Sequence, residues 1–353
     1  MNDIATLQNR AANKEWIDRA KGICIILVVM MHTALGVAKV LGDTGFLHAV
    51  VAWTKPFRMP DFFLLSGFLA GGIGAMSWRA FVDRRIVHYL YFYVVWLVIL
   101  TGLKLAMEGV LSPARFAEAV AIGMVEPFGS LWFIYVLPAF MIVTRLAKGG
   151  WAWAIGVGAF ILHVWAATYP GGGAFTMESQ ATNWVALDSF ALFFVFFYGG
   201  YCLRDVIGAF TAFVRRSPAG GVVLLTLWAI LHSYALHAGL TAVPGLTIVA
   251  GLLGAFAILA VAVLIENSRA FGWLAYCGKH SLAIYLAFVI PMSASRSFLI
   301  GAANVTDPDI LMVLVLAMAI VVPLVLERAV RSTPLRFLFS RPGWTRPGER
   351  NQS

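Results

Sequence analysis

Long apolar runs separated by short polar connections constrain this chain more than any other feature. A window of about 19 residues, suited to transmembrane helices, finds ten such runs in the 353 residues. Hydrophobic residues make up 61% of the chain and charged residues 12%, against about 45–50% and about 25% in soluble domains. The composition therefore excludes a water-soluble globular protein. Each run is expected to cross a bilayer as a helix, which satisfies its own backbone hydrogen bonds.

The predicted fold class is all-α, a polytopic membrane protein with about ten transmembrane helices. The predicted spans are 22–40, 48–76, 86–106, 129–146, 151–169, 184–203, 220–238, 244–265, 280–299 and 310–328. The second span is interrupted by Pro56 and Pro60, so we expect it to kink or unwind there. Because a bilayer tolerates irregular backbone only where it faces protein or a water-filled cavity, an internal cavity is predicted near Pro60.

The distribution of basic residues predicts the orientation. With the N-terminus inside, 20 of the 26 Lys and Arg residues fall on the inner side and six fall outside or in the outer half of the membrane. Both termini are therefore expected in the cytoplasm, and the same bias accounts for the net charge of +9 without any nucleic-acid partner. The six are Lys39, Lys55, Arg58, Lys104, Arg115 and Arg296.

Three segments follow from this orientation: a cytoplasmic N-terminal segment 1–21, a ten-helix membrane domain 22–330, and a basic cytoplasmic tail 331–353 that is expected to be partly disordered. The polar, glycine-rich stretch 169–184 is placed to cover an external opening.

Cys24, Cys202 and Cys277 lie in or beside apolar runs without metal or redox spacing. We therefore predict neither a metal site nor a disulfide framework.

Ionisable residues inside the apolar runs are costly and are candidates for function. They include His32 in the first span, Arg58 and Asp61 in the second and Asp188 in the sixth. His32 follows Lys21 by eleven residues, or roughly 16 Å along a helix, which places its imidazole near the middle of the bilayer. A neutral imidazole there can act as a general base. The alternative is a core histidine hydrogen-bonded to a neighbouring helix.

Arg58 and Asp61 are three residues apart and share one helical face if the segment is helical. One of them could orient His32 or bind an acceptor hydroxyl, or the two could form a structural ion pair at the kink. Asp188 has no partner nearby in the sequence, so we expect it to be protonated, hydrogen-bonded or facing the cavity.

Basic residues at the inner face form a second candidate site. Arg84, Arg85 and His88 precede the third span, and Lys21 ends the N-terminal segment. Arginine offers a fork that matches phosphate oxygens, so such a cluster can bind a phosphorylated cytoplasmic ligand. It can equally reflect the positive-inside rule or contact anionic lipid.

Five blocks, taken in order, carry a family resemblance. They are KGICIILVVMMH (21–32), FRMPDFFLLSGFL (57–69), FVDRRIVHYL (81–90), LWFIYVLPAF (131–140) and GKHSLAIYL (278–286). On ten helices, they resemble the acyltransferase type 3 family of polytopic inner-membrane acyltransferases. The resemblance implies transfer of an acyl group, commonly acetyl, from cytoplasmic acyl-coenzyme A to a hydroxyl of a glycan or lipid-linked sugar at the outer face.

The resemblance also implies residue roles. His32 matches the essential histidine of the family and Lys21 its basic partner, while Arg84 and Arg85 fall where the family carries a basic motif. His88 stands where that motif usually has its second arginine, and Ala287 stands where the ninth-helix block often ends in histidine. Because His88 replaces an arginine, the basic motif matches the coenzyme-binding motif of the family only in part. Because Ala287 replaces a histidine, the resemblance implies no role for residue 287.

Acyl transfer from a thioester needs a base, donors for the developing oxyanion and exclusion of water. We expect direct transfer with His32 as the base, assisted by Asp61 or Asp188. Arg58, Ser66 or the Trp132 indole could donate to the oxyanion, and Ser66, Trp132 and Tyr135 are candidates for binding substrate. No tightly bound cofactor is expected, because acyl-coenzyme A is a co-substrate. Membrane lipid is an expected partner, and the sequence leaves self-association open.

Two other classes of function compete with this interpretation. Intramembrane His, Asp and Arg residues also build the pathways of transporters and flippases, and the break between Pro56 and Pro60 resembles their discontinuous helices. The sequence shows no matching pair of broken helices in two halves, which argues against a transporter. A catalytically inactive scaffold is the third alternative, for which the spacing of Lys21 and His32 would be a coincidence.

Overall fold

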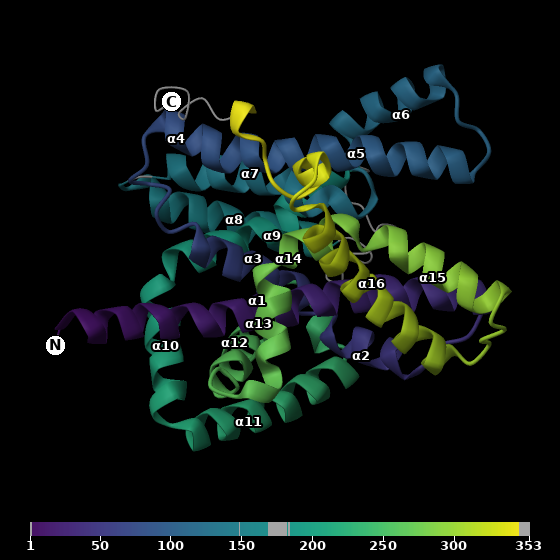
Figure 1. Ribbon diagram of the computed structural model, residues 1–353. Coiled ribbons are helices and arrows are strands. Elements are labelled where there is room, and N and C mark those ends of the chain that lie inside the picture. Colours follow the sequence, from purple (N-terminus) through teal and green to yellow (C-terminus); the bar gives the residue numbers. More distant parts are fainter. Residues whose placement is uncertain (1, 148, 169–181, 183, 346–353) are drawn as a thin grey trace.

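The computed structural model describes residues 2–147, 149–168, 182 and 184–345 (Figure 1). Its described residues form helices and contain no strand, so the predicted all-α class is confirmed. The α-helices are α1 (Asn2–Leu41), α2 (Phe46–Thr54), α3 (Arg58–Leu69), α4 (Trp78–Phe81), α5 (His88–Met107), α6 (Pro113–Val125), α7 (Trp132–Leu146), α8 (Trp151–Ala167), α9 (Val185–Cys202), α10 (Arg204–Arg216), α11 (Pro218–His237), α12 (Leu246–Leu264), α13 (Gly272–Lys279), α14 (Ser281–Ala287), α15 (Val289–Gly301) and α16 (Pro308–Val330).

Seven helical stretches in the described part are long and apolar enough to cross a membrane: Glu15–Leu41, Trp78–Met107, Pro113–Leu146, Val185–Cys202, Pro218–His237, Leu246–Leu264 and Pro308–Val330. The pair α14 and α15, bent by 56°, would make an eighth span, and α8 is apolar but shorter. Every predicted run coincides with helix, including the second, which contains α2 and α3. The count of ten crossings and the side on which the termini lie remain predictions.

The interruption expected in the second run is present between α2 and α3. α2 ends at Thr54, and the chain turns before α3 begins at Arg58. Pro56 has no N–H to continue α2, whereas Pro60 lies in the first turn of α3, where proline is tolerated. The Lys55 N–H bonds to the Ala52 carbonyl at 3.3 Å, which leaves the Val51 carbonyl without a backbone donor; the Thr54 hydroxyl donates to it at 3.2 Å.

Glycines bring two helix pairs into backbone contact. A Cβ atom at Gly22 of α1 or at Gly278 of α13 would fall onto backbone atoms of the other helix. Gly67 of α3 and Gly200 of α9 cross in the same manner. In membranes, where helix association depends on close packing, small residues allow such approaches. The two crossings therefore fix the positions of α1 and α3, the helices that carry His32 and Arg58.

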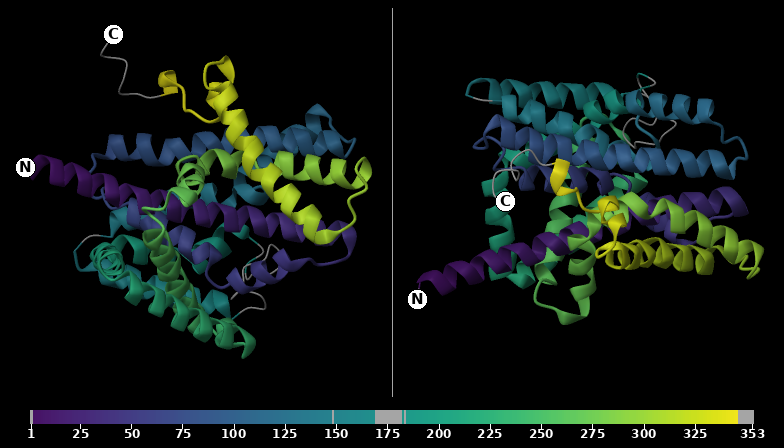
Figure 2. Two further views of the ribbon diagram at one scale, coloured as in Figure 1. Left: turned by 60° about the horizontal axis from the view of Figure 1, so that its bottom comes forward. Right: turned by 45° about the horizontal axis from the view of Figure 1, so that its top comes forward.

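α1 runs through the centre of the molecule, with α5 on one side of it and α11 on the other (Figure 1). The pair α15 and α16 lies beside the C-terminal half of α1 in both views of Figure 2. α10 runs across the direction of α1 near the N-terminal end of the bundle (Figure 1). Arg215 of α10 forms a two-pronged ion pair with Glu266, at 2.6 and 2.9 Å, which raises the pKa of Arg215. This ion pair joins α10 to Glu266, two residues after the end of α12.

The segment after α16 packs against α5 as far as the structure describes it. The Tyr91 hydroxyl donates to the Phe337 carbonyl at 3.0 Å, and the Trp96 indole donates to the Leu338 carbonyl at 2.9 Å. Arg341 is buried and pairs with Asp83. The tail is thus docked through residue 345, while residues 346–353 lie outside the described residues.

Candidate active site

A cavity of about 1000 Å³ lies beside the break between α2 and α3, and Pro56 and Pro60 line it. The internal cavity predicted near Pro60 is thus confirmed. Its walls come from helices far apart in the sequence, from α1 to α15. The polar residues on these walls are His32, Lys39, His48, Lys55, Arg58, Ser130, Trp132, His163, Thr247 and Tyr285.

His32 is half-buried on the α1 wall of this cavity. Its ring lies 5.1 Å from the ring of Phe288, and it forms no hydrogen bond with any described residue. The hydrogen-bonded core histidine considered from the sequence is therefore not what the structure shows. The α1 residues on the wall run from Val28 to Lys39, so the cavity extends from His32 toward the C-terminal end of α1.

Arg58 is 4% exposed and lines the cavity at the start of α3. Its Nη1 donates to the Val51 carbonyl at 3.1 Å and to the Thr54 hydroxyl at 3.5 Å. The Val51 carbonyl is the one that lacks a backbone donor at the end of α2, and it accepts from the Thr54 hydroxyl as well. The guanidinium is also close enough to interact electrostatically with His32. The break in the second apolar run thus holds a positive charge on the wall of the cavity that His32 also lines.

Asp61 lies one turn further along α3 and is 3% exposed. Its two carboxylate oxygens are buried without a conventional hydrogen-bond partner in the described part of the chain, and the Cys24 thiol is the polar group beside them. It does not line the cavity, and no ion pair joins it to Arg58. Arg58 and Asp61 therefore interact electrostatically without forming the close ion pair considered from the sequence.

Asp188 is buried in the first turn of α9 and is hydrogen-bonded, one of the three alternatives expected from the sequence. It accepts a hydrogen bond from the Thr182 backbone N–H at 3.1 Å and another from the Thr182 hydroxyl at 2.9 Å. These bonds hold Thr182, three residues before α9, against the first turn of that helix. Asp188 is not on the cavity wall.

Of the three residues predicted to bind substrate, only Trp132 lines the cavity. It starts α7, and its ring lies 5.8 Å from that of Phe63. The Ser66 hydroxyl donates to a carbonyl of its own helix at 2.8 Å, and the Tyr135 hydroxyl donates to the carbonyls of Met124 and Val125, each at 3.1 Å.

The residues predicted to bind the coenzyme do not line the cavity. Lys21 lies earlier on α1 and pairs with Asp18 at 3.7 Å. Arg84 and Arg85 belong to a π-helical turn, Val82–Val87, that joins α4 to α5. His88 begins α5, and its ring lies 5.1 Å from that of Phe92. The structure thus brings together His32, Arg58 and Trp132, and leaves the basic cluster apart from them.

Two wall residues were not recognised from the sequence. The Tyr285 hydroxyl donates to the Ser130 carbonyl, and the Ser130 hydroxyl oxygen is buried without a hydrogen-bond partner among the described residues. Tyr285 lies in the block GKHSLAIYL, so its presence in a motif was the available signal. Ser130 follows Gly129, whose φ of 47° turns the chain into α7. The hydrogen-bonding capacity of this buried hydroxyl is not used by any described residue.

His163 and Thr247 form a hydrogen-bonded pair on the wall that α8 and α12 contribute. His163 Nδ1 lies 2.7 Å from the Leu192 carbonyl, and its Nε2 lies 2.8 Å from the Thr247 hydroxyl. A carbonyl can only accept, so Nδ1 carries the proton and Nε2 of the neutral ring accepts from Thr247. This orientation fixes the His163 ring and polarises the Thr247 hydroxyl.

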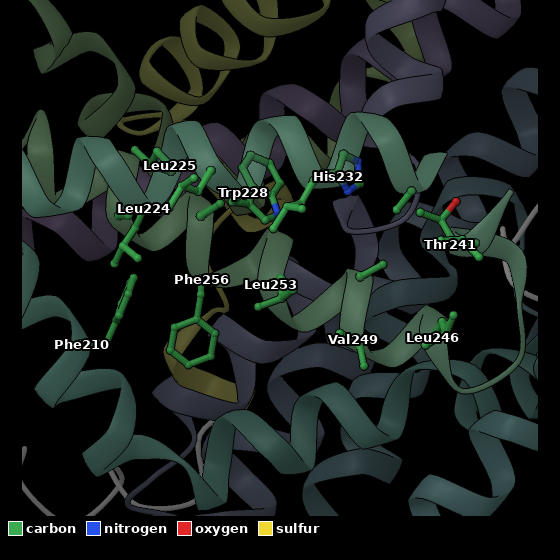
Figure 3. Close-up of a pocket in the computed structure, with 17 residues that line it drawn as sticks. Phe210, Leu224, Leu225, Trp228, His232, Thr241, Leu246, Val249, Leu253 and Phe256 are labelled. Carbon is green, nitrogen blue, oxygen red and sulfur yellow. The ribbon is translucent and has the colours of Figure 1, made fainter. Parts of the chain in front are cut away.

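A second cavity, of about 530 Å³, lies between α10, α11 and α12 (Figure 3). Its lining is apolar except for the polar groups of Trp228, His232 and Thr241, and the last two lie toward one end of it in Figure 3. His232 Nε2 is already hydrogen-bonded to the Trp53 carbonyl at 2.9 Å. This groove suits hydrocarbon and gathers no catalytic groups, so the cavity at His32 is the candidate active site.

Residues 14–328 match the family description "Acyltransferase domain". The chain therefore belongs to this family of membrane acyltransferases, as its sequence blocks indicate. It is a multi-pass inner-membrane protein.

Among curated proteins it is similar to the inner membrane protein YcfT of Escherichia coli strain K12. The two are 28% identical over 155 residues, which cover 37% of this chain and 43% of that protein. The chain thus spans less than half the length of this relative. No solved structure matches the chain.

Proposed function

We propose that this protein transfers an acyl group from cytoplasmic acyl-coenzyme A to a hydroxyl of a glycan or lipid-linked sugar at the outer face, with His32 as general base. The observation that carries the proposal is the position of His32 on the wall of a large cavity that Arg58 also lines. Membership of the acyltransferase family supports the reaction class. In this proposal the acyl group is acetyl and both termini are cytoplasmic.

His32 has a ring that no described residue engages by hydrogen bonding, so its lone pair is available to a ligand. In the proposed reaction, His32 accepts the proton of the acceptor hydroxyl while the hydroxyl oxygen attacks the thioester carbonyl carbon. The carbon–sulfur bond then breaks, and the leaving thiolate takes the proton back from the imidazolium. No covalent enzyme intermediate is needed.

The developing negative charge on the thioester oxygen needs donors already in place. Arg58 supplies a positive charge on the same wall as His32, and Ser130 and Trp132 supply further donors. Apolar wall residues such as Phe62 and Phe133 limit the water that would hydrolyse the acyl group. Lys21, Arg84, Arg85 and His88 lie outside the cavity, and in this proposal they bind the coenzyme phosphates at the inner face.

The test compares wild type with His32→Ala and His32→Gln in purified, detergent-solubilised protein, measuring acetyl-coenzyme A consumption and acetyl transfer. Loss of the general base should lower kcat by roughly 10²–10⁴-fold. The thermal unfolding temperature should stay close to that of wild type, because His32 makes no hydrogen bond to a described residue.

Arg84→Gln and Arg85→Gln complete the experiment, because they should raise the KM for acetyl-coenzyme A and leave kcat nearly unchanged. An unchanged KM would remove both from the coenzyme site. Absence of thioester consumption by the wild type with any acceptor would instead favour transport.

A further inference from the structure

The wall of the His32 cavity carries positive charge that no acidic residue on the wall balances. Three cationic residues line it, Lys39, Lys55 and Arg58, together with His32, His48 and His163. No Asp or Glu is among the described residues that line the cavity. An apolar cavity with charges of one sign selects ligands of the opposite sign.

Asp61, off the wall, interacts electrostatically with Arg58, but no carboxylate in the described part of the protein forms a close ion pair with any of the three cations. Lys55 and Arg58 are, in addition, close enough to repel each other electrostatically. Lys39 and Lys55 are exposed, so their ammonium groups are accessible to a ligand, and a bound anion would offset the repulsion between Lys55 and Arg58.

The cations lie toward one end of the cavity. His32 and Lys39 are seven residues apart on α1, and His48 and Lys55 are seven apart at α2 and its end. Seven residues are two helical turns, so each pair lies on one face, with about 10 Å between its members. α1 and α2 pack together and are joined by residues 42–45, so the two basic faces flank the same space. That space adjoins His32 on the side away from Lys21.

We propose that the acceptor is anionic and carries a carboxylate or phosphate that binds Lys39, Lys55 and His48, about two helical turns from the hydroxyl that His32 deprotonates. This inference rests on the proposed acyltransferase function and assigns its acceptor class. Acyl-coenzyme A is also anionic, but in the proposed reaction it approaches from the Lys21 end of α1. The experiment therefore separates acceptor from donor.

Binding is measured first, without turnover. Purified full-length protein is titrated with an oligogalacturonide and with its methyl ester, which has the same acceptor hydroxyls but no charge. A second pair, phosphatidylglycerol and glucosyl diacylglycerol in mixed micelles, tests a lipid source of the anion. In at least one pair the charged member should bind at least about tenfold more tightly, the effect expected of one partly buried charge contact.

The variants Lys39→Gln and Lys55→Gln, singly and together, should each reduce this preference about tenfold. Arg115→Gln is the control, because Arg115 is exposed on α6, away from the cavity, and carries the same charge. The same proteins are then assayed for transfer from labelled acetyl-coenzyme A. The lysine variants should raise the KM for the charged acceptor and leave the KM for acetyl-coenzyme A unchanged.

Preference for the oligogalacturonide would identify a glycan acceptor, and preference for phosphatidylglycerol a lipid acceptor. Equal binding of charged and neutral members in both pairs would overturn the proposal, as would a preference that survives the double variant. A rise in the KM for acetyl-coenzyme A alone would assign the cations to the donor and also overturn it. Charge-selective binding without thioester consumption would confirm the anion site while refuting the proposed acyltransferase reaction.

Discussion

Replacement of Gly278 by alanine tests whether the crossing of α1 and α13 positions the active site. A Cβ atom at Gly278 would lie well within 3.0 Å of the Asp18 backbone carbonyl, closer than real Cβ atoms approach. The obstacle is backbone and cannot rotate away, so α1 and α13 must separate by on the order of 1 Å. Such overpacking costs about 1–3 kcal/mol.

The same displacement should reach the reaction, because His32 is on the helix that must move. A misplacement on the order of 1 Å can lower a catalytic rate about 10²-fold. Gly278→Ala is therefore expected to lower both the thermal unfolding temperature, followed by tryptophan fluorescence in detergent, and the rate of acetyl transfer. Gly22→Ala, whose Cβ would meet the Leu274 carbonyl, should behave alike.

Gly158→Ala is the matched control. Gly158 is exposed on α8, and a Cβ atom added there would have no neighbouring atom within 4 Å. Because alanine favours helix over glycine, this variant should be as stable as wild type or slightly more so. If Gly278→Ala matched Gly158→Ala in unfolding temperature and in rate, the close crossing would have no role in positioning His32, and the reasoning would be wrong.

Three further variants test other contacts. Asp61→Asn should leave the unfolding temperature close to that of wild type, because a buried carboxyl without a close ion pair is held in its neutral form, and should slow transfer if Asp61 assists His32; a rise in the unfolding temperature would show that the carboxyl is buried as a charge. Glu266→Gln should destabilise by about 1–3 kcal/mol, measured by thermal unfolding, because it breaks the fork with Arg215. Trp96→Phe should expose the tail to limited proteolysis, because the indole bond to Leu338 is lost, and unchanged cleavage would contradict the docking.

The helices and the break could be predicted from the sequence because both are local properties. The length of an apolar run determines whether it can span a bilayer, and Pro56 and Pro60 mark where such a run must stop. α6 was not predicted, because it is short and lies between two longer runs. The start of α6 could nevertheless have been predicted from the sequence, because Ser112 caps the helix and Pro113 occupies its first turn.

The grouping of the polar residues could not be predicted, because it depends on how helices pack. Arg58 and Asp61 are three residues apart, but Arg58 reaches back to the Val51 carbonyl and so does not pair with Asp61. The partner of Asp188 is Thr182, six residues before it, in a connection with no regular periodicity. Tyr285 reaches the cavity only because α14 packs there, far in sequence from the helices that carry His32 and Arg58.

The interruption of the second apolar run places a charged side chain, Arg58, on the cavity wall. A helix that ends inside a bilayer leaves carbonyls without partners, a fault that would normally be repaired by neighbouring donors. Here the donors are the Thr54 hydroxyl and Arg58, so the interruption and the hydrogen bonds that compensate for it together hold a cation on the cavity wall. A chain evolved to straighten this segment would gain a regular helix and lose the anchor for that charge. Selection on the activity should therefore preserve an imperfection that selection on stability alone would remove.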